Sequence, residues 1–274
     1  MYNKQFYRLS SVTVKGCEWV YLISGMYWDK GERESNQDSL ILEQVLTKRG
    51  RVVLAAVCDG IGGLTRGEVA SGFACEKLKE YFYRELLPMV MKGRSRRAIG
   101  KCFCRCLYES SEGLKKYAKE EPIGLGTTVS AVFLWKKHYA TVHLGDSRIY
   151  QIRRKKIRQL TVDHKQGKNR LTKCLSSFPY QMPDIRYGRV RNRTGFLLCS
   201  DGFYHFPEKE LLKSLLSPAE INSESAISKR LRELAVYGMK RGEKDNMAAI
   251  YLLCCRGLFD ERGKKKPYGR DDFK

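Results

Sequence analysis

Residues 52–63 read VVLAAVCDGIGG, and this stretch decides how the rest of the chain is interpreted. Its first seven residues are all apolar and are bounded by a charged residue on each side, as is typical of a strand. Asp59 follows directly, and the glycines after it predict a tight turn. An apolar strand that runs into an aspartate and a turn recurs at Asp146 in YATVHLGDSR and at Asp201 in FLLCSDG. Asp245 stands in KDN, just before the apolar run MAAIYLL.

Outward from this stretch, the spacing of the apolar residues predicts an α+β fold. Two amphipathic helices follow the turn, at 66–92 and 95–119, and Ser95 is the expected N-cap of the second. Strands joined by only a few residues must be antiparallel, and two long consecutive helices between groups of strands argue against an alternating βαβ layout. The expected strands are 17–24, 39–46, 51–58, 127–135, 138–144, 147–152, 196–199 and 247–254, with further helices near 208–216 and 224–240.

The four aspartates at strand ends predict a site for divalent cations. One Asp-Gly after a strand is ordinary turn chemistry, but paired strands bring their ends together, so four such carboxylates are expected to meet at one rim. Unpaired carboxylates that close would repel and raise one another's pKa, and a divalent cation removes the conflict. An all-oxygen ligand set suits Mg²⁺ or Mn²⁺ better than zinc. Two such ions about 3.5–4 Å apart can clamp a phosphoryl group and activate a bridging water.

The chain resembles the metal-dependent protein phosphatases of the PP2C type (PPM family), in their compact bacterial form. The resemblance covers roughly residues 25–255 and implies a sandwich of two antiparallel β-sheets between helical layers (αββα). It also implies a serine/threonine phosphoprotein phosphatase in which a metal-activated water attacks phosphorus without a phosphoenzyme intermediate. The matching segments, in the family's order, are GERESNQDS (31–39), AAVCDGIGG (55–63), GEVAS (67–71), GTT (126–128), HLGDSRIY (143–150), LTVDH (160–164), LLCSDG (197–202) and KDN (244–246).

The resemblance assigns metal ligands residue by residue. Asp59 would bridge two Mn²⁺ or Mg²⁺ ions, with the carbonyl of Gly60 on one of them. Asp201 and Asp245 would hold the other ion. Asp146, together with Asp201, would serve a third and weaker ion.

The resemblance also implies the residues of the reaction itself. Arg33, which can bind a phosphate through two nitrogens, would hold the substrate phosphate. Asp38 would orient metal-bound water, and Asp59 would act through the ions that it bridges. We expect Thr127 and Thr128 to support the sheet near the site rather than to act as nucleophiles.

Two single residues depart from the family pattern. Ile61 stands where eukaryotic members have a histidine, and it cannot protonate a leaving group. Activity is therefore expected to be relatively stronger on aryl phosphates than on alkyl ones. Gln37 stands where many members have glutamate, so weaker metal binding or a water-mediated role is expected there.

The largest departure is a shortened flap region near 165–195. The family usually has a longer stretch there, with a mobile flap over the rim of the active site. Residues 151–195 hold thirteen Lys and Arg against two Asp. One hypothesis is that a positively charged rim replaces the flap and attracts acidic substrates, with Arg189, Arg191 and Arg193 among its charges. The simpler alternative is solvated charge on an exposed loop.

Composition limits the remaining possibilities. The 274 residues carry a formal net charge of +22 and are 42% hydrophobic, which is enough apolar material for one large core. We expect a single domain over 1–257 and a basic tail at 258–274. The ten cysteines show no zinc spacing and are interpreted as buried thiols. No apolar run is long enough to span a membrane, and the N-terminus does not resemble a secretory signal, so a cytoplasmic protein is expected.

Two other functions stay open at this point. A catalytically weak PP2C-type fold could serve as a phosphoprotein-binding or regulatory module, although a pure binder has no need of mutually repelling acids. Nucleic-acid binding through residues 151–195 is not expected, because no recognised binding motif occurs. The expected partners are phosphorylated proteins, with a serine/threonine kinase and its substrates implied by the resemblance, and the expected state is a monomer.

Overall fold

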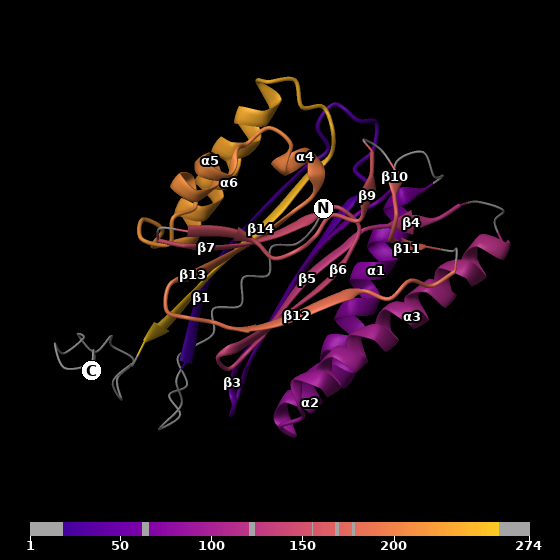
Figure 1. Ribbon diagram of the computed structural model, residues 1–274, viewed down its shortest axis with the longest axis horizontal. Helices are drawn as coiled ribbons and strands as arrows, with labels where there is room; N and C mark the ends of the chain where they lie inside the picture. The colour runs from indigo at the N-terminus through magenta and orange to yellow at the C-terminus, as the bar shows by residue number, and fades with distance from the viewer. Residues whose placement is uncertain are drawn as a thin grey trace.

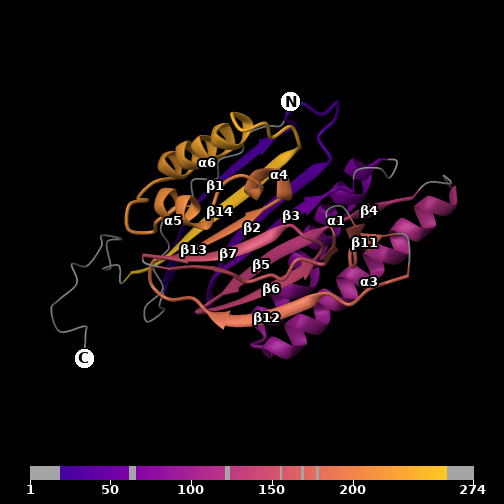
Figure 2. The same cartoon turned by 45° about the horizontal axis from the view of Figure 1, so that its top comes forward.

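The computed structural model describes residues 19–61, 66–120, 124–154, 156–167, 170–176 and 179–257, and within them two five-stranded antiparallel sheets form the centre of the molecule (Figure 2). The first sheet has the order β1 (Trp19–Asp29), β14 (Met247–Gly257), β13 (Thr194–Cys199), β7 (Arg148–Arg153) and β8 (Lys156–Gln159). The second has the order β12 (Asp184–Arg189), β6 (His138–Leu144), β5 (Val129–Trp135), β3 (Gly50–Asp59) and β2 (Asp38–Thr47).

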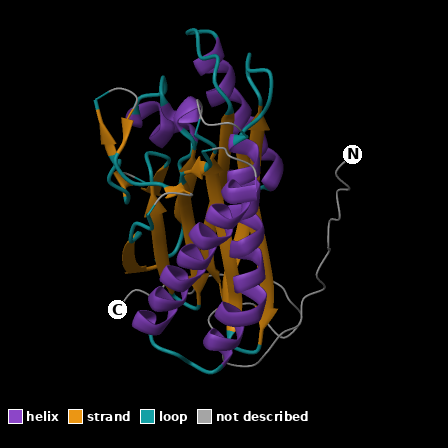
Figure 3. Cartoon of the chain, turned by 90° about the vertical axis from the view of Figure 1, so that its right-hand side faces the viewer, coloured by secondary structure: helices purple, strands orange, loops and turns teal. Residues whose placement is uncertain are grey.

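Helices cover the outer face of each sheet, so the predicted αββα sandwich is confirmed (Figures 1 and 3). The sheet that contains β3 is covered by α1 (Gly67–Tyr81), the π-helical turn η1 (Phe82–Leu86), α2 (Leu87–Met91) and α3 (Arg96–Glu120). The sheet that contains β14 is covered by α4 (Asp201–Tyr204), α5 (Lys209–Leu215) and α6 (Glu224–Met239). No helix among the described residues is long and apolar enough to cross a membrane.

The strand period of two residues explains why the central strands are apolar throughout. In β3, Val52 and the alternate residues up to Cys58 pack against α1 and α3, whereas Val53 and the alternate residues up to Val57 pack against the opposite sheet. Strand β14 divides its side chains in the same way between α6 and the sheet interface. Because both faces of these strands are buried, the sequence shows an unbroken apolar run rather than an alternation.

The helix predictions are confirmed with one change. Ser95 caps α3 as expected, since its Oγ accepts from the backbone N of Ala98 at 3.2 Å. The segment expected as one helix over 66–92 instead passes through the π-helical turn Phe82–Leu86 just before Pro88. Proline cannot donate the backbone hydrogen bond of a regular helix interior, and a local change of helix type accommodates this loss.

Several short strands between 156 and 189 were not predicted. They are β8, β12, the small antiparallel pair of β9 (Lys165–Gln166) with β10 (Arg170–Leu171), and β11 (Leu175–Ser176). Strand β11 pairs with β4 (Gly126–Thr127), which lies at the start of the expected strand 127–135. Their sequences are short or rich in arginine, and β12 is an edge strand with exposed side chains, so none carries a clear apolar period.

Strand β12 places Arg189 away from the charged rim to which the hypothesis assigned it, although Lys165 of the same basic segment does line the cavity. It pairs with β6 so that Asp184 lies near the Asp146 end of the sheet and Arg189 lies opposite His138, at the far end. Five residues of strand separate these two ends, a distance of about 17 Å. Arg193, further along, donates to backbone carbonyls between α5 and α6. The predicted tail at 258–274 lies outside the described residues.

Candidate metal centre

Two carboxylates meet where β2 begins and β3 ends. Asp38 and Asp59 are direct cross-strand partners in the antiparallel pair. The backbone of Asp59 is fixed by two threonines, because its N donates to Thr128 Oγ1 at 3.0 Å and its carbonyl accepts from Thr127 Oγ1 at 2.9 Å. These threonines therefore support the turn that carries Asp59, as the sequence predicts.

The turn after Asp59 lies against the start of α1, and only glycine fits there. A Cβ on Gly60 would stand 2.4 Å from the carbonyl oxygen of Gly67, a contact that backbone atoms cannot relieve. The N of Gly60 donates to the carbonyl of Gln37 at 3.1 Å, which ties the loop before β2 to the same turn. Gly62 and Gly63 of the quoted stretch lie outside the described residues.

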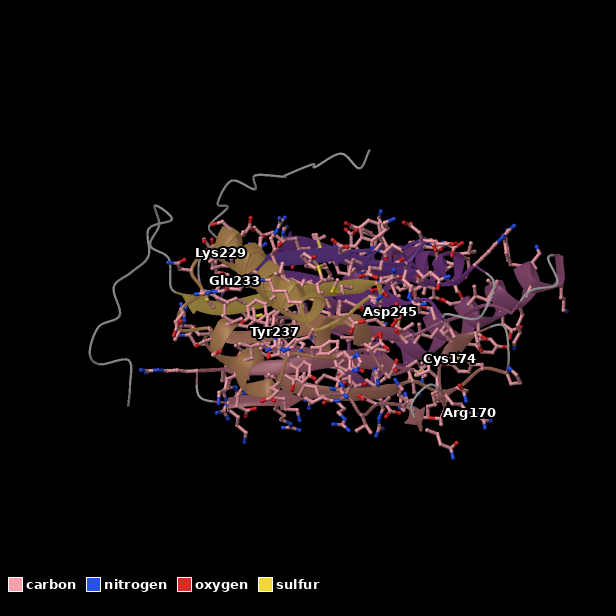
Figure 4. The ribbon with its side chains drawn as sticks, turned by 90° about the horizontal axis from the view of Figure 1, so that it is seen from above. Arg170, Cys174, Lys229, Glu233, Tyr237 and Asp245 are labelled. Atoms are coloured by element: carbon pink, nitrogen blue, oxygen red, sulfur yellow. The ribbon has the colours of Figure 1, made fainter. Side chains whose placement is uncertain are left out.

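The other three aspartates reach this place from both sheets. Asp201 opens α4 two residues after β13, and Asp245 lies two residues before β14, the neighbour of β13. Asp146 follows β6 in a turn that needs a glycine, because Gly145 has φ +107° and a Cβ there would stand 2.5 Å from the Thr128 side chain. In Figure 4, Asp245 lies beyond the end of α6, which runs towards it through the labelled side chains of that helix.

A cavity of about 610 Å³ opens where these turns meet. Asp38 lies behind its wall and is only 2% exposed, whereas Asp59 and Asp201 remain partly open to solvent. Six of the predicted site residues line the cavity, namely Arg33, Asp59, Gly60, Asp146, Asp201 and Asp245, and the departing residues Gln37 and Ile61 line it as well.

Two basic side chains pair with acids of this cavity. Arg33 holds Asp245 through two hydrogen bonds, Nε to Oδ1 at 3.0 Å and Nη2 to Oδ2 at 2.8 Å. Lys165 Nζ lies 3.0 Å from Asp146 Oδ2. In this arrangement, no three His, Cys, Asp or Glu side chains of the described residues are gathered closely enough to hold a metal ion. Any ion at Asp245 would have to share that carboxylate with Arg33 or displace the guanidinium.

A family model for protein phosphatase 2C matches residues 30–241.

The chain belongs to this family.

Bacterial relatives are identical to it at about a quarter of the aligned residues. The serine/threonine phosphatase Stp of Listeria welshimeri is 25% identical over 222 residues, 73% of this chain and 85% of the relative. The protein phosphatase PhpP of Streptococcus pneumoniae (strain D39) is 25% identical over 250 residues, 82% of this chain and 94% of the relative. Both alignments extend over most of the PP2C relative and most of this chain.

Solved structures show the same fold. The crystal structure of a bacterial serine phosphatase superimposes with a TM-score of 0.73 at 26% identity, covering 85% of this chain and 98% of that one. The catalytic domain of the serine/threonine phosphatase PstP, crystallised with two manganese ions, gives a TM-score of 0.69 at 24% identity, covering 86% and 99%.

The acids of this PP2C cavity are held in their charged form only at a cost. Burial, followed by the charges of Asp38, Asp201, Asp146 and Asp245, raises the pKa of Asp59 well above its usual value. Burial is also the largest cause that raises the pKa of Asp38 to about 7 and that of Asp201 to about 6. Each shift means that the folded protein resists the charge of that carboxylate, so the cavity has an unmet demand for positive charge.

The residues present fit the divalent cations of the PP2C family. The Oδ1 atom of Asp38 is buried and has no hydrogen-bond partner among the described residues, while its Oδ2 accepts from Ser200 Oγ at 2.7 Å. A buried carboxylate oxygen without a partner is costly unless a cation, a water or a proton serves it. The donor set consists of carboxylates and one glycine carbonyl, which is the chemistry that Mg²⁺ and Mn²⁺ prefer.

Sequence reasoning did not predict the contacts of three residues that shape the site. Asn246 receives a hydrogen bond from Gln37 N at 2.8 Å and donates to the carbonyls of Lys30 and Ser35, so it fixes the loop that carries Arg33. Ser200 holds Asp38, and Lys165 holds Asp146.

The sequence contains a signal for two of these missed residues. Asn246 and Ser200 each adjoin a predicted metal ligand inside a quoted motif, KDN and LLCSDG. Lys165 belongs to the basic segment of the hypothesised charged rim, and the structure places it in the cavity wall, but its contact with Asp146 was not predicted.

Proposed function

We propose that this protein is a phosphoprotein phosphatase that hydrolyses phosphoserine and phosphothreonine with two bound Mn²⁺ or Mg²⁺ ions. In this assignment Asp59 and the carbonyl of Gly60 hold one ion, and Asp59, Asp201 and Asp245 hold the other. The observation that carries the proposal is the convergence of these carboxylates with Arg33 around one cavity whose negative charge is only partly compensated, in a chain of the PP2C family.

The ions, when bound, would supply Lewis acidity and an activated water for attack on phosphorus. The chain's own residues would provide the rest. Arg33 is 58% exposed in its side chain, and its bonds to Asp245 use Nε and Nη2, so the donors of Nη1 are directed to neither oxygen of that pair. A guanidinium so placed can hold the phosphate of a substrate through charge-assisted hydrogen bonds. Asp38, anchored by Ser200, has one oxygen left to orient water or accept a proton.

The apolar residue Ile61 limits how the leaving group of the substrate can be protonated. Ile61 lines the cavity and offers no proton, and its N is bonded to the carbonyl of Gly126, which fixes its position. Ile61 therefore cannot protonate a serine or threonine alkoxide as it leaves. This supports the expectation that aryl phosphates, whose leaving groups need little protonation, react relatively faster.

The experiment that tests the proposal is phosphate release from a phosphothreonine peptide, with and without Mn²⁺. The wild type should show metal-dependent turnover, and Asp201→Asn, which removes a ligand charge, should abolish it. Glu220→Gln removes one charge from an exposed turn between α5 and α6 and should leave turnover unchanged. Equal turnover in Asp201→Asn and wild type would refute the assignment of the ligands.

The same experiment addresses the binding-module alternative, which membership of the PP2C family does not favour. A wild-type protein that binds metal and phosphopeptide but releases no phosphate would support that alternative. A kinase partner, a monomeric state and a cytoplasmic location remain predictions that follow from the resemblance and the composition.

A further inference from the structure

Lys165 stands at the carboxylate pair to which the family resemblance assigns a third ion. Its ammonium nitrogen is 3.0 Å from Asp146 Oδ2, and it also lies within electrostatic reach of Asp201. The side chain of Asp146 is 7% exposed and that of Lys165 is 28% exposed, so the pair sits in the cavity wall rather than in open solvent. A partly buried pair of this kind is screened less by water than an exposed one.

The backbone fixes Lys165 at this position. His164, its neighbour, donates its backbone N to the carbonyl of Gly145 at 2.8 Å, and its ring Nδ1 accepts from the N of Gly145 at 3.1 Å. His164 is thus bound through both its backbone and its ring to Gly145, the residue that precedes Asp146. On the other side, Lys165 is the register partner of Leu171 in the β9–β10 pair. The lysine therefore approaches Asp146 because its main chain is held there, and not by a chance contact of a long surface side chain.

The ring of His164 adds a further anchor. It stacks on His143 with 4.8 Å between ring centroids, and its Nε2 lies 3.2 Å from Asp184 Oδ2. The stacked pair links β6 to the segment that carries Lys165. Packing and hydrogen bonds thus act together on the chain directly before the lysine.

A divalent cation between Asp146 and Asp201 would meet this ammonium group at close range. Two cations that compete for the same carboxylate oxygens repel each other. Because Lys165 is attached to the chain, its ammonium group has a high effective concentration at Asp146, and a free metal ion must compete against that concentration. Removing the lysine charge would leave Asp146 and Asp201 as two neighbouring acids without a counter-charge.

We propose that Lys165 is a built-in cation that occupies the Asp146–Asp201 pair in place of a third metal ion. The inference rests on the proposed function, in which Asp59, Asp201 and Asp245 hold two ions. It assigns to Asp146 the role of a partner for Lys165 instead of a metal ligand in the working enzyme. Lys165 is then a positioning residue that neutralises this side of the cavity.

The test counts the Mn²⁺ ions bound per chain, by electron paramagnetic resonance of free Mn²⁺ during a titration into the millimolar range. Wild type should bind two ions, and Lys165→Met, which keeps the apolar stem and loses the charge, should bind a third. Lys165→Arg retains a cation and should bind two. The double variant Lys165→Met with Asp146→Asn should lose the third ion again.

Lys173→Met is the matched control. Lys173 pairs with Asp184 at the same 3.0 Å distance but does not line the cavity, so this variant should bind two ions like the wild type. Thermal unfolding of each variant verifies that it is folded before its ions are counted.

A third ion in the wild type, or only two in folded Lys165→Met, would overturn the inference while leaving the proposed function intact. Absence of bound Mn²⁺ from every variant would overturn the inference and the proposed function together.

Discussion

Replacing Asp38 by asparagine removes a buried negative charge while it preserves the size and shape of the side chain. The wild-type carboxylate is 2% exposed, receives a hydrogen bond from Ser200 and leaves Oδ1 without a partner among the described residues. In Asp38→Asn the amide oxygen can keep the bond from Ser200. The amide nitrogen would then face Asp59, the cross-strand partner, as a donor instead of a repelling acceptor. We expect the metal-free variant to be more stable than the metal-free wild type.

The magnitude follows from the pKa of Asp38, which burial raises from 3.8 to about 7. Since one pKa unit corresponds to ~1.4 kcal/mol, a folded protein that keeps this group charged at pH 8 loses about 4 kcal/mol relative to the unfolded chain. The folded-state pKa lies above the unfolded one, so this loss is absent below about pH 4, grows as the pH rises, and is complete above about pH 7. At pH 5 the same relation leaves less than half of it, between about 1 and 2 kcal/mol.

The assay is thermal or urea unfolding in EDTA at pH 5 and pH 8. At pH 8 the melting temperature of Asp38→Asn should exceed that of the wild type by about 10 °C, with a clearly smaller difference at pH 5. Asp184→Asn is the control with the opposite sign: burial would raise the pKa of Asp184, but Lys173 and His164 outweigh it and lower the pKa. That variant should be less stable than wild type at pH 8. If Asp38→Asn is destabilised, or its advantage does not depend on pH, our reasoning about the charged cavity is wrong.

Three further predictions concern turnover and the loop that carries Arg33. For the wild type, kcat on p-nitrophenyl phosphate should exceed kcat on a phosphothreonine peptide because Ile61 cannot donate a proton, and the reverse order would refute this. Arg170→Glu should lower kcat/KM more on acidic than on neutral phosphopeptides, because β10 adjoins the cavity through Leu171. The matched variant Arg189→Glu, at the far end of β12, should leave kcat/KM unchanged on both kinds of peptide. Equal losses in the two variants would contradict the placement of the charges. Asn246→Ala removes three hydrogen bonds to the loop that carries Arg33. It should therefore lower the free energy of unfolding by about 3 kcal/mol and raise KM for phosphopeptides. An unchanged KM in a folded variant would show that the loop does not need this anchor.

Local patterns in the sequence were sufficient for the sheets and helices that form the core. The strand before Asp59 and the helix after Ser95 could each be predicted from their own residues. A strand buried on two faces and a helix buried on one face differ in the spacing of their apolar residues. Edge strand β12 could not be predicted in this way, because its exposed arginines and its glycine show no periodic spacing of apolar residues.

The candidate site divides in the same way. Each aspartate at a strand end could be found from its motif, and the cavity brings Asp59, Asp146, Asp201 and Asp245 together as expected. What the motifs did not contain is which side chains hold these acids. Ser200 reaches Asp38 from the other sheet, over 162 positions of sequence, and Arg33 reaches Asp245 over 212.

Sequence alone determined the fold class, the family and the identity of the acids, because these depend on residue types at fixed local spacings. Tertiary structure alone decided the burial that raises the pKa of Asp38, the remoteness of Arg189 from the cavity, and the contact of Lys165 with Asp146. Each of these is set by the register of strands and turns distant along the chain. A register is fixed by packing over a whole sheet, and no local stretch of sequence encodes it.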